Sequence, residues 1–128
     1  MSKELKKILF VDDDEDIHLI VKLSLHEIPN LEFRSAYSGE DAIKIAMEFL
    51  PDLILLDVMM PKMDGFATLQ AIRLMPTLLN IPIIFLTARV QKAEIETYLK
   101  LGVLDVITKP FDPATFAPNI LKLFSTTY

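Results

Sequence analysis

Apolar stretches of strand length alternate along this chain with longer segments in which apolar residues recur at helical spacing. Five candidate strands can be counted, at residues 7–11, 31–36, 53–56, 82–86 and 104–107. The first, third and fourth are nearly continuous Ile, Leu, Val and Phe, as expected for strands buried on both faces of a sheet. Strands and helices that alternate in this way predict βαβ units, and therefore an α/β fold around one parallel sheet.

The segments between the candidate strands carry their apolar residues on one helical face. Residues 39–50 are predicted to form a helix with Ser38 as its N-cap. Gly102 fits a left-handed residue after the fourth helix. The expected apolar stripes are Ile17, Ile20, Val21 and Ile28 in the first helix, Ala42, Ile43, Ala46, Met47 and Leu50 in the second, Phe66, Leu69 and Ile72 in the third, and Ile95, Tyr98 and Leu99 in the fourth.

A fifth helix is predicted after the last strand. Asp112 and Pro113 fit its N-cap and its first position, where the missing N–H of proline costs nothing. Pro118 would remove a backbone donor inside the helix. We therefore expect the start of this helix to be irregular.

Length and composition indicate one globular domain over residues 1–128. The chain is 52% apolar with a mean hydropathy of +0.37, which is enough for one packed core. A net charge of -5 disfavours direct binding to nucleic acid. The amino terminus is too polar for a signal peptide and no apolar run approaches the roughly 20 residues that cross a bilayer, so we expect a cytoplasmic protein without membrane contact. The absence of cysteine excludes disulfides, thiol nucleophiles and thiolate zinc sites.

Polar residues follow the candidate strands at the points where the strands end. Asp12 and Asp13 follow the first strand, Asp57 the third, Thr87 the fourth and Lys109 the fifth. Because the carboxyl ends of parallel strands lie at one edge of a sheet, where ligands bind, we expect these side chains to converge. Each signal alone has an ordinary explanation, since an acidic run at a helix start is usually solvated. Their occurrence at successive strand ends favours a functional site.

Three carboxylates placed together need a positive partner. At about 5 Å and an effective dielectric near 20, each pair repels by about 3 kcal/mol. Mg²⁺ suits such a site because it takes carboxylate oxygens, keeps several waters and shares its remaining positions with phosphate. Lys109 adds a permanent positive charge. Asp57 is the candidate nucleophile, since a carboxylate that attacks a phosphoryl donor forms an acyl phosphate.

Four segments carry a family resemblance, and together they cover nearly the whole chain. They are KILFVDDDED at 7–16, PDLILLDVMMPKMDG at 51–65, IPIIFLTAR at 81–89 and KPF at 109–111. The sequence resembles the response-regulator receiver domain of two-component signalling, in particular the stand-alone receivers of chemotaxis. This resemblance implies a doubly wound, flavodoxin-like (βα)5 fold with strand order 2-1-3-4-5.

The resemblance also implies roles for individual residues. Asp57 would be phosphorylated by a phosphohistidine on a sensor histidine kinase or phosphotransfer protein. Asp12, Asp13, Asp57 and the backbone carbonyl of Met59 would hold Mg²⁺. Thr87, with Ala88 beside it, would bind the phosphoryl group as the switch hydroxyl, and Lys109 would pair with that group. Such a protein is a phosphoacceptor switch rather than an enzyme acting on other substrates.

Two features concern the signal that follows phosphorylation. Many family members carry an aromatic residue three positions before the conserved lysine, where this chain has Val106. The surface of the fourth helix, fifth strand and fifth helix is where this family often meets its downstream partners.

Met59 and Arg89, each two residues beyond a site residue, are expected to control how long the acyl phosphate survives. His18 and His26 are expected to be ordinary surface or boundary residues.

Three other functions fit the sequence less well. An aspartyl-nucleophile phosphatase would also use a strand-end Asp and Mg²⁺, but its general acid is missing because Met59 stands at the second position of the Asp-x-Asp pattern. A nucleotide or flavin module lacks a glycine-rich phosphate loop, since Gly39, Gly65 and Gly102 form no such motif. A docking domain that works without phosphorylation leaves the acidic site unexplained. Whether the chain is a natural stand-alone receiver or part of a longer regulator stays open.

Overall fold

The sheet has the predicted order and direction. The computed structural model describes residues 3–88 and 91–127. Its parallel strands are ordered β2-β1-β3-β4-β5, which confirms the doubly wound fold. The strands are β1 (Lys7–Val11), β2 (Glu32–Ala36), β3 (Leu53–Asp57), β4 (Ile83–Thr87) and β5 (Asp105–Thr108).

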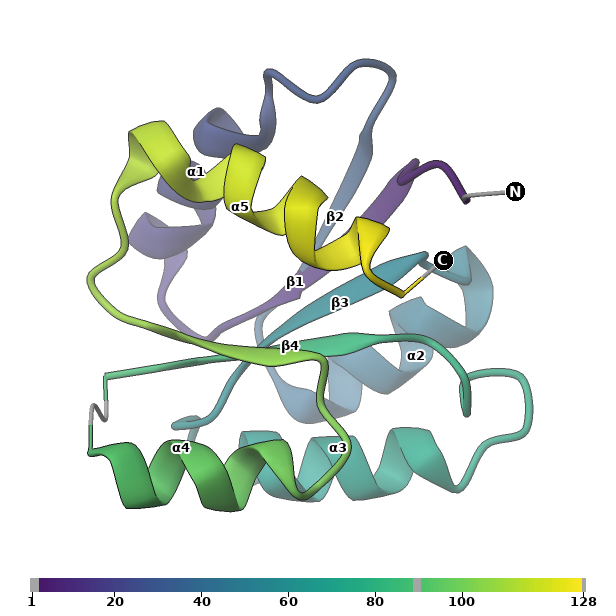
Figure 1. Ribbon diagram of the computed structural model, residues 1–128. Coiled ribbons are helices and arrows are strands. Elements are labelled where there is room, and N and C mark those ends of the chain that lie inside the picture. Colours follow the sequence, from purple (N-terminus) through teal and green to yellow (C-terminus); the bar gives the residue numbers. More distant parts are fainter. Residues whose placement is uncertain (1–2, 89–90, 128) are drawn as a thin grey trace.

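Helices cover both faces of the sheet, so the molecule has three layers (Figure 1). Helices α1 and α5 lie side by side on one face, and α2, α3 and α4 lie on the other. Because both faces are covered, β3 and β4 are buried along their whole length. The helices are α1 (Glu15–Leu25), α2 (Gly39–Phe49), α3 (Gly65–Arg73), α4 (Lys92–Leu99) and α5 (Pro113–Ser125).

The helix ends largely follow the predicted signals. Ser38 caps α2 by accepting a hydrogen bond from the Asp41 N–H at 3.1 Å. Asp112 caps α5 by accepting from the Ala114 N–H at 2.9 Å, and Pro113 is its first residue. Gly102 has a φ of 89°, in the left-handed region expected for it after α4.

The predicted apolar face of α1 is partly wrong. Ile20 is 41% exposed, and Ile28 is buried but lies beyond the end of the helix at Leu25. The buried face is formed instead by His18, Val21 and Leu25, which point toward β1 and α5. Apolar residues therefore occupy both sides of this helix, and tertiary packing selects which side is covered.

Further sequence-based expectations need correction. The start of α5 is regular, because the helix runs without interruption from Pro113 through Pro118. Met47 and Leu50, expected on the buried face of α2, are 54% and 50% exposed, and Leu50 lies just after the helix as its C-cap. Leu99 of α4 is 40% exposed. Packing on one narrow stripe of each helix leaves these flanking side chains outside.

Strand register aligns the ends that carry the polar residues. Asp57 is the last residue of β3 and pairs in register with Leu86, one residue before Thr87 at the end of β4. Thr87 in turn pairs with Thr108, the last residue of β5. The following N–H of Lys109 donates to the Thr87 carbonyl at 2.8 Å. No helix within residues 3–88 and 91–127 is long and apolar enough to cross a bilayer.

Candidate functional site

Three carboxylates meet at the carboxyl edge of the sheet. Asp12 and Asp13 lie in the loop after β1, and Asp57 ends β3. One carboxylate oxygen from each lies within 4.8 Å of the others. Asp12 is 1% exposed and Asp57 5%, whereas Asp13 is open to solvent. The site therefore has a buried floor formed by two acids and an open side formed by the third.

Lys109 joins the two buried acids. Its ammonium Nζ donates to Asp12 Oδ2 at 2.7 Å and to Asp57 Oδ1 at 3.1 Å. Asp12 and Lys109 are 97 residues apart in the sequence, and the strand order brings them together. Charge-assisted hydrogen bonds of this kind hold the buried carboxylates in fixed orientations.

The acids and the lysine change each other's protonation. Burial raises the pKa of Asp57 above its usual 3.8, and repulsion by Asp12 raises it further; Lys109 and a hydrogen bond from the Met59 backbone oppose this. For Lys109, burial works to lower the pKa, but the hydrogen bond and charge of Asp12, followed by those of Asp57, outweigh burial and raise it. Lys109 is therefore an ammonium at neutral pH.

The site suits a divalent, oxygen-binding cation. Asp12, Asp13 and Asp57 against the single ammonium of Lys109 leave two negative charges uncompensated, the charge that one such ion neutralises. All the ligand atoms are carboxylate oxygens, the type that Mg²⁺ prefers. The exposure of Asp13 leaves a side on which water and a phosphate group have access. The residues thus fit the ion that the sequence led us to expect.

The loop after Asp57 is held closely against the strand end. The Gly65 N–H donates to the Val58 carbonyl at 2.9 Å, and the Val58 N–H donates to the Leu86 carbonyl at 3.0 Å. A Cβ at Gly65 would lie 2.5 Å from the Asp57 carbonyl oxygen and 2.8 Å from Val58 Cα, so only glycine fits here. Asp64 caps α3 by accepting from the Ala67 N–H at 2.9 Å. This loop sets the backbone position of Asp57.

The other predicted site residues surround this centre. Thr87 is fully buried at the end of β4, and Ala88 follows it exposed to solvent. Met59, two residues beyond Asp57, is 60% exposed. Arg89 lies outside the described residues. Val106 of β5 is half-buried and packs against the core on the α2, α3 and α4 face.

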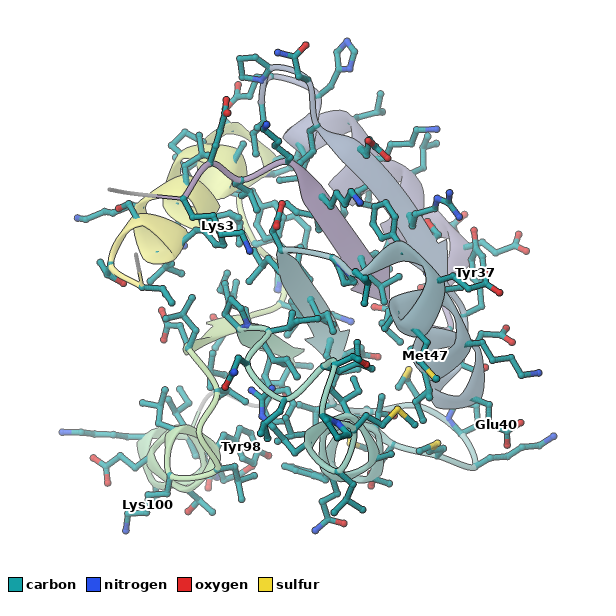
Figure 2. All side chains as sticks on the ribbon, turned by 90° about the vertical axis from the view of Figure 1, so that its right-hand side faces the viewer. Lys3, Tyr37, Glu40, Met47, Tyr98 and Lys100 are labelled. Carbon is teal, nitrogen blue, oxygen red and sulfur yellow. The ribbon has the colours of Figure 1, made fainter. Side chains whose placement is uncertain are left out.

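That same core contains an aromatic cluster. Tyr98 of α4 contacts Phe66 and Phe85 at ring-centroid distances of 5.2 and 6.0 Å. Figure 2 shows Tyr98 on the inner side of α4 and Lys100 on its outer side. Phe85 lies two residues before Thr87 on β4, so the two side chains leave the strand on the same face.

One residue in contact with the site, His18, was not expected there from the sequence. His18, expected at the surface or boundary, is only 4% exposed and is hydrogen-bonded to the backbone of Asp12. His26, by contrast, is exposed as expected. The sequence offered no signal for His18, because its hydrogen-bond partners come from the loop after β1 and from β2, whose distance from α1 depends on tertiary packing.

Comparison with known proteins identifies relatives over nearly all of this chain. The family model described as "Response regulator receiver domain" matches residues 8–120. A probable transcriptional regulator, ycf27 of Cyanophora paradoxa, is 41% identical over 122 residues, 95% of this chain and 49% of the relative. The alkaline phosphatase synthesis transcriptional regulatory protein PhoP of Bacillus subtilis is 42% identical over 108 residues, 84% of this chain and 44% of the relative.

Solved structures of response regulators also match this chain. The chemotaxis response regulator CheY4 of Vibrio cholerae superposes with a TM-score of 0.84 at 28% sequence identity, covering 93% of this chain and 98% of that one. This chain therefore matches nearly the whole of that chemotaxis regulator, whereas it spans about half the length of the curated relatives it matches.

Proposed function

This chain belongs to the response regulator receiver domain family, whose members are phosphoacceptor switches of two-component signalling, and on that basis we propose that it accepts a phosphoryl group on Asp57 in a Mg²⁺-dependent reaction. The observation that carries the proposal is the meeting of Asp12, Asp13 and Asp57 around Lys109 at one edge of the sheet. We propose that the whole of residues 1–128 forms this one domain.

In the proposed reaction a carboxylate oxygen of Asp57 attacks phosphorus as the bond from phosphorus to the donor's histidine nitrogen breaks. The leaving imidazole keeps the electron pair of that bond. Asp12, Asp13, Asp57 and the Met59 carbonyl would hold Mg²⁺, which when bound neutralises charge on the phosphoryl oxygens. Lys109 supplies a second positive charge, and the Thr87 hydroxyl and the Ala88 backbone bind the phosphoryl group once it is transferred.

The proposed donor is a sensor histidine kinase or a phosphotransfer protein. The proposed output is altered protein binding through the surface of α4, β5 and α5. Because Val106 has no ring to move, the signal would pass through displacement of the β4–α4 loop and α4. Val106→Tyr is then expected to leave phosphorylation intact and to alter partner affinity, measured in both phosphorylation states. Equal affinity of parent and variant would show that this surface is not the output.

The central test is phosphorylation by acetyl phosphate, followed by intact-mass measurement with and without Mg²⁺. The parent is expected to gain one phosphoryl group only when Mg²⁺ is present, and Asp57→Asn to gain none. Asp13→Ala should react far more slowly, because repulsion among the acids and charge on the phosphate lose part of their counterion. Equal mass gain in Asp57→Asn would exclude Asp57 as the acceptor. Undiminished phosphorylation in excess chelator would exclude the metal requirement.

We further propose that the phosphorylated state is long-lived. Hydrolysis requires a water in line with the acyl phosphate bond, and Met59 offers no strong donor or acceptor to orient one. Arg89 can bind phosphoryl oxygens but is a poor base. The double variant Met59→Asn with Arg89→Glu should position water and shorten the lifetime. A phosphate-release time course in which this variant is as slow as the parent would refute the proposed control.

A further inference from the structure

His18 of α1 is a buried side chain that contacts the backbone of the acidic pair. Its ring lies 4.6 Å from the Phe10 ring and 4.2 Å from the Tyr37 ring, measured between centroids. Nε2 is 2.6 Å from the backbone carbonyl oxygen of Asp12, and Nδ1 is 2.9 Å from Ser35 Oγ. Figure 2 shows Tyr37 at the outer edge of the molecule, beyond the end of β2. This one side chain therefore links α1 to the ends of β1 and β2.

The partner of Nε2 determines which nitrogen carries hydrogen. A carbonyl oxygen only accepts hydrogen bonds, so Nε2 of His18 must be the donor to Asp12. The Ser35 hydroxyl is both donor and acceptor and adapts to whatever Nδ1 presents. The Phe10 and Tyr37 rings contact the imidazole, and His18 and Asp12 are 4% and 1% exposed, so water has little access to this hydrogen bond. A hydrogen bond in such surroundings is stronger than one in water.

The carbonyl that His18 holds belongs to the peptide that joins the two acids. Asp12 is fixed by its N–H, which donates to the Ala36 carbonyl at 3.1 Å, and by its carboxylate, which accepts from Lys109. The Asp12 carbonyl and the Asp13 N–H lie in one rigid peptide plane. Fixing that carbonyl therefore fixes the direction in which the chain continues to Asp13. Asp13 is exposed, so its backbone largely determines where its carboxylate lies.

We propose that His18 is a positioning residue of the metal site: by donating to the Asp12 carbonyl, it orients the Asp12–Asp13 peptide so that the Asp13 carboxylate meets those of Asp12 and Asp57. This inference rests on the proposed function. Residues that orient metal ligands typically change metal affinity by 10–100-fold when replaced. His18 acts on the backbone of the ligands rather than on a ligand atom, so we expect about the lower end of that range.

Two variants of equal length isolate the hydrogen bond. His18→Gln keeps a donor at the far end of the side chain, whereas His18→Met fills similar space without one. Mg²⁺ affinity is measured by NMR titration of amide shifts in the loops after β1 and β3. We expect His18→Met to bind Mg²⁺ about 10-fold more weakly than the parent, and His18→Gln to recover most of the loss. Phosphorylation of His18→Met by acetyl phosphate should then need more Mg²⁺ and approach the parental rate at saturation.

Ser35→Ala is the matched control. It removes a hydrogen bond from the same ring but leaves the link to Asp12 in place, so its Mg²⁺ affinity should stay within about threefold of the parent. Equal weakening in Ser35→Ala and His18→Met would reduce the effect to general loosening of α1 against β2 and overturn the proposal. Parental Mg²⁺ affinity in His18→Met would overturn it as well. A parent that binds no Mg²⁺ would refute the proposed function and this inference together.

A measurement on the unmodified chain keeps the proposal testable if His18→Met does not fold. The chain has two histidines, and exposed His26 serves as an internal reference. Nitrogen NMR of the imidazoles should show hydrogen on Nε2 of His18, and addition of Mg²⁺ should shift the His18 signals but not those of His26. A His18 ring with hydrogen only on Nδ1, or one that does not respond to Mg²⁺, would contradict the proposed role.

Discussion

Replacing the proposed phosphoacceptor is expected to stabilise the metal-free protein. Burial raises the pKa of Asp57, and repulsion by Asp12 raises it further, which means that the charged form of Asp57 is disfavoured in the folded state. Asp57→Asn removes the charge and keeps an oxygen that accepts from Lys109. The substitution therefore removes an unfavourable charge and leaves the main contact in place.

The size of the effect follows from the geometry. With their oxygens within 4.8 Å, Asp12 and Asp57 repel by about 3 kcal/mol at an effective dielectric near 20. Attraction between the Asp57 carboxylate and the Lys109 ammonium, 3.1 Å apart, is about 5 kcal/mol on the same scale. The attraction exceeds the repulsion by only about 2 kcal/mol, so the lost hydration of a buried carboxylate, several kcal/mol, decides the sign. We expect Asp57→Asn to raise the free energy of unfolding by about 2 kcal/mol, and the melting temperature of a chain of this length by about 6 °C.

Mg²⁺ should offset the higher stability of Asp57→Asn, because it stabilises the parent more than the variant. A ligand present at 100 times its dissociation constant stabilises the native state by about 2.7 kcal/mol. Asp57→Asn has lost one charged ligand and gains less from the same concentration. Thermal unfolding of parent and variant, each in chelator and in saturating Mg²⁺, gives the four values needed. A variant that melts below the parent in chelator would refute the reasoning. An equal rise in melting temperature for both proteins on addition of Mg²⁺ would refute it as well.

Asp52→Asn is the control, because Asp52 is an acid just before the same strand. Asp52 precedes β3, accepts from the Lys6 and Lys7 N–H groups at 3.0 Å each, and pairs with Lys3 at 3.1 Å. Its charge has favourable partners and no acidic neighbour among those contacts. Asp52→Asn should therefore lower the melting temperature and leave the rise in melting temperature caused by Mg²⁺ unchanged.

Three further predictions concern pH, Lys109 and the loop after β3. Because the folded pKa of Asp57 lies above its ordinary 3.8, the metal-free parent should lose stability as pH rises from about 3.8 through the raised pKa, and a pH series of melting curves should show no such loss in Asp57→Asn. Lys109→Met leaves two buried acids uncompensated and should lower the free energy of unfolding in chelator by about 2 kcal/mol, measured by urea denaturation; unchanged stability would show that the ion pairs contribute nothing. Gly65→Ala places a methyl group against the Asp57 backbone, so it should lower the free energy of unfolding by about 2 kcal/mol and slow phosphorylation. Gly102→Ala is the control: it has open space around it but a φ of 89°, so it should cost about 1 kcal/mol and leave phosphorylation at the parental rate.

The sequence was sufficient for the architecture. Strands β1, β3 and β4 are apolar except for one end residue each, and this pattern reflects burial on both faces of the sheet. Parallel strands place their carboxyl ends at one edge, so the meeting of Asp12, Asp57 and Lys109 could be predicted without coordinates. Local signals also located the caps of α2 and α5, because an N-cap depends on residues a few positions apart.

Only the tertiary structure decided which face of α1 is buried. Apolar residues occupy both sides of α1, and periodicity alone favoured Ile20, which is 41% exposed. The choice depends on how α1 packs against α5 and β1, a contact between elements distant in the chain. The burial of His18 is a consequence of that choice.

The internal bonding of the site was likewise beyond the sequence. His18 reaches Ser35 across 17 residues, and Lys109 reaches Asp57 across 52 and Asp12 across 97. Sequence established which chemical groups arrive at the sheet edge, because the strands can be located from local patterns and parallel strands all end at the same edge. Hydrogen bonds and the pKa of Asp57 are sensitive to differences in distance of a few tenths of an ångström and to exclusion of water. Only packing of the complete core determines these distances and this exclusion.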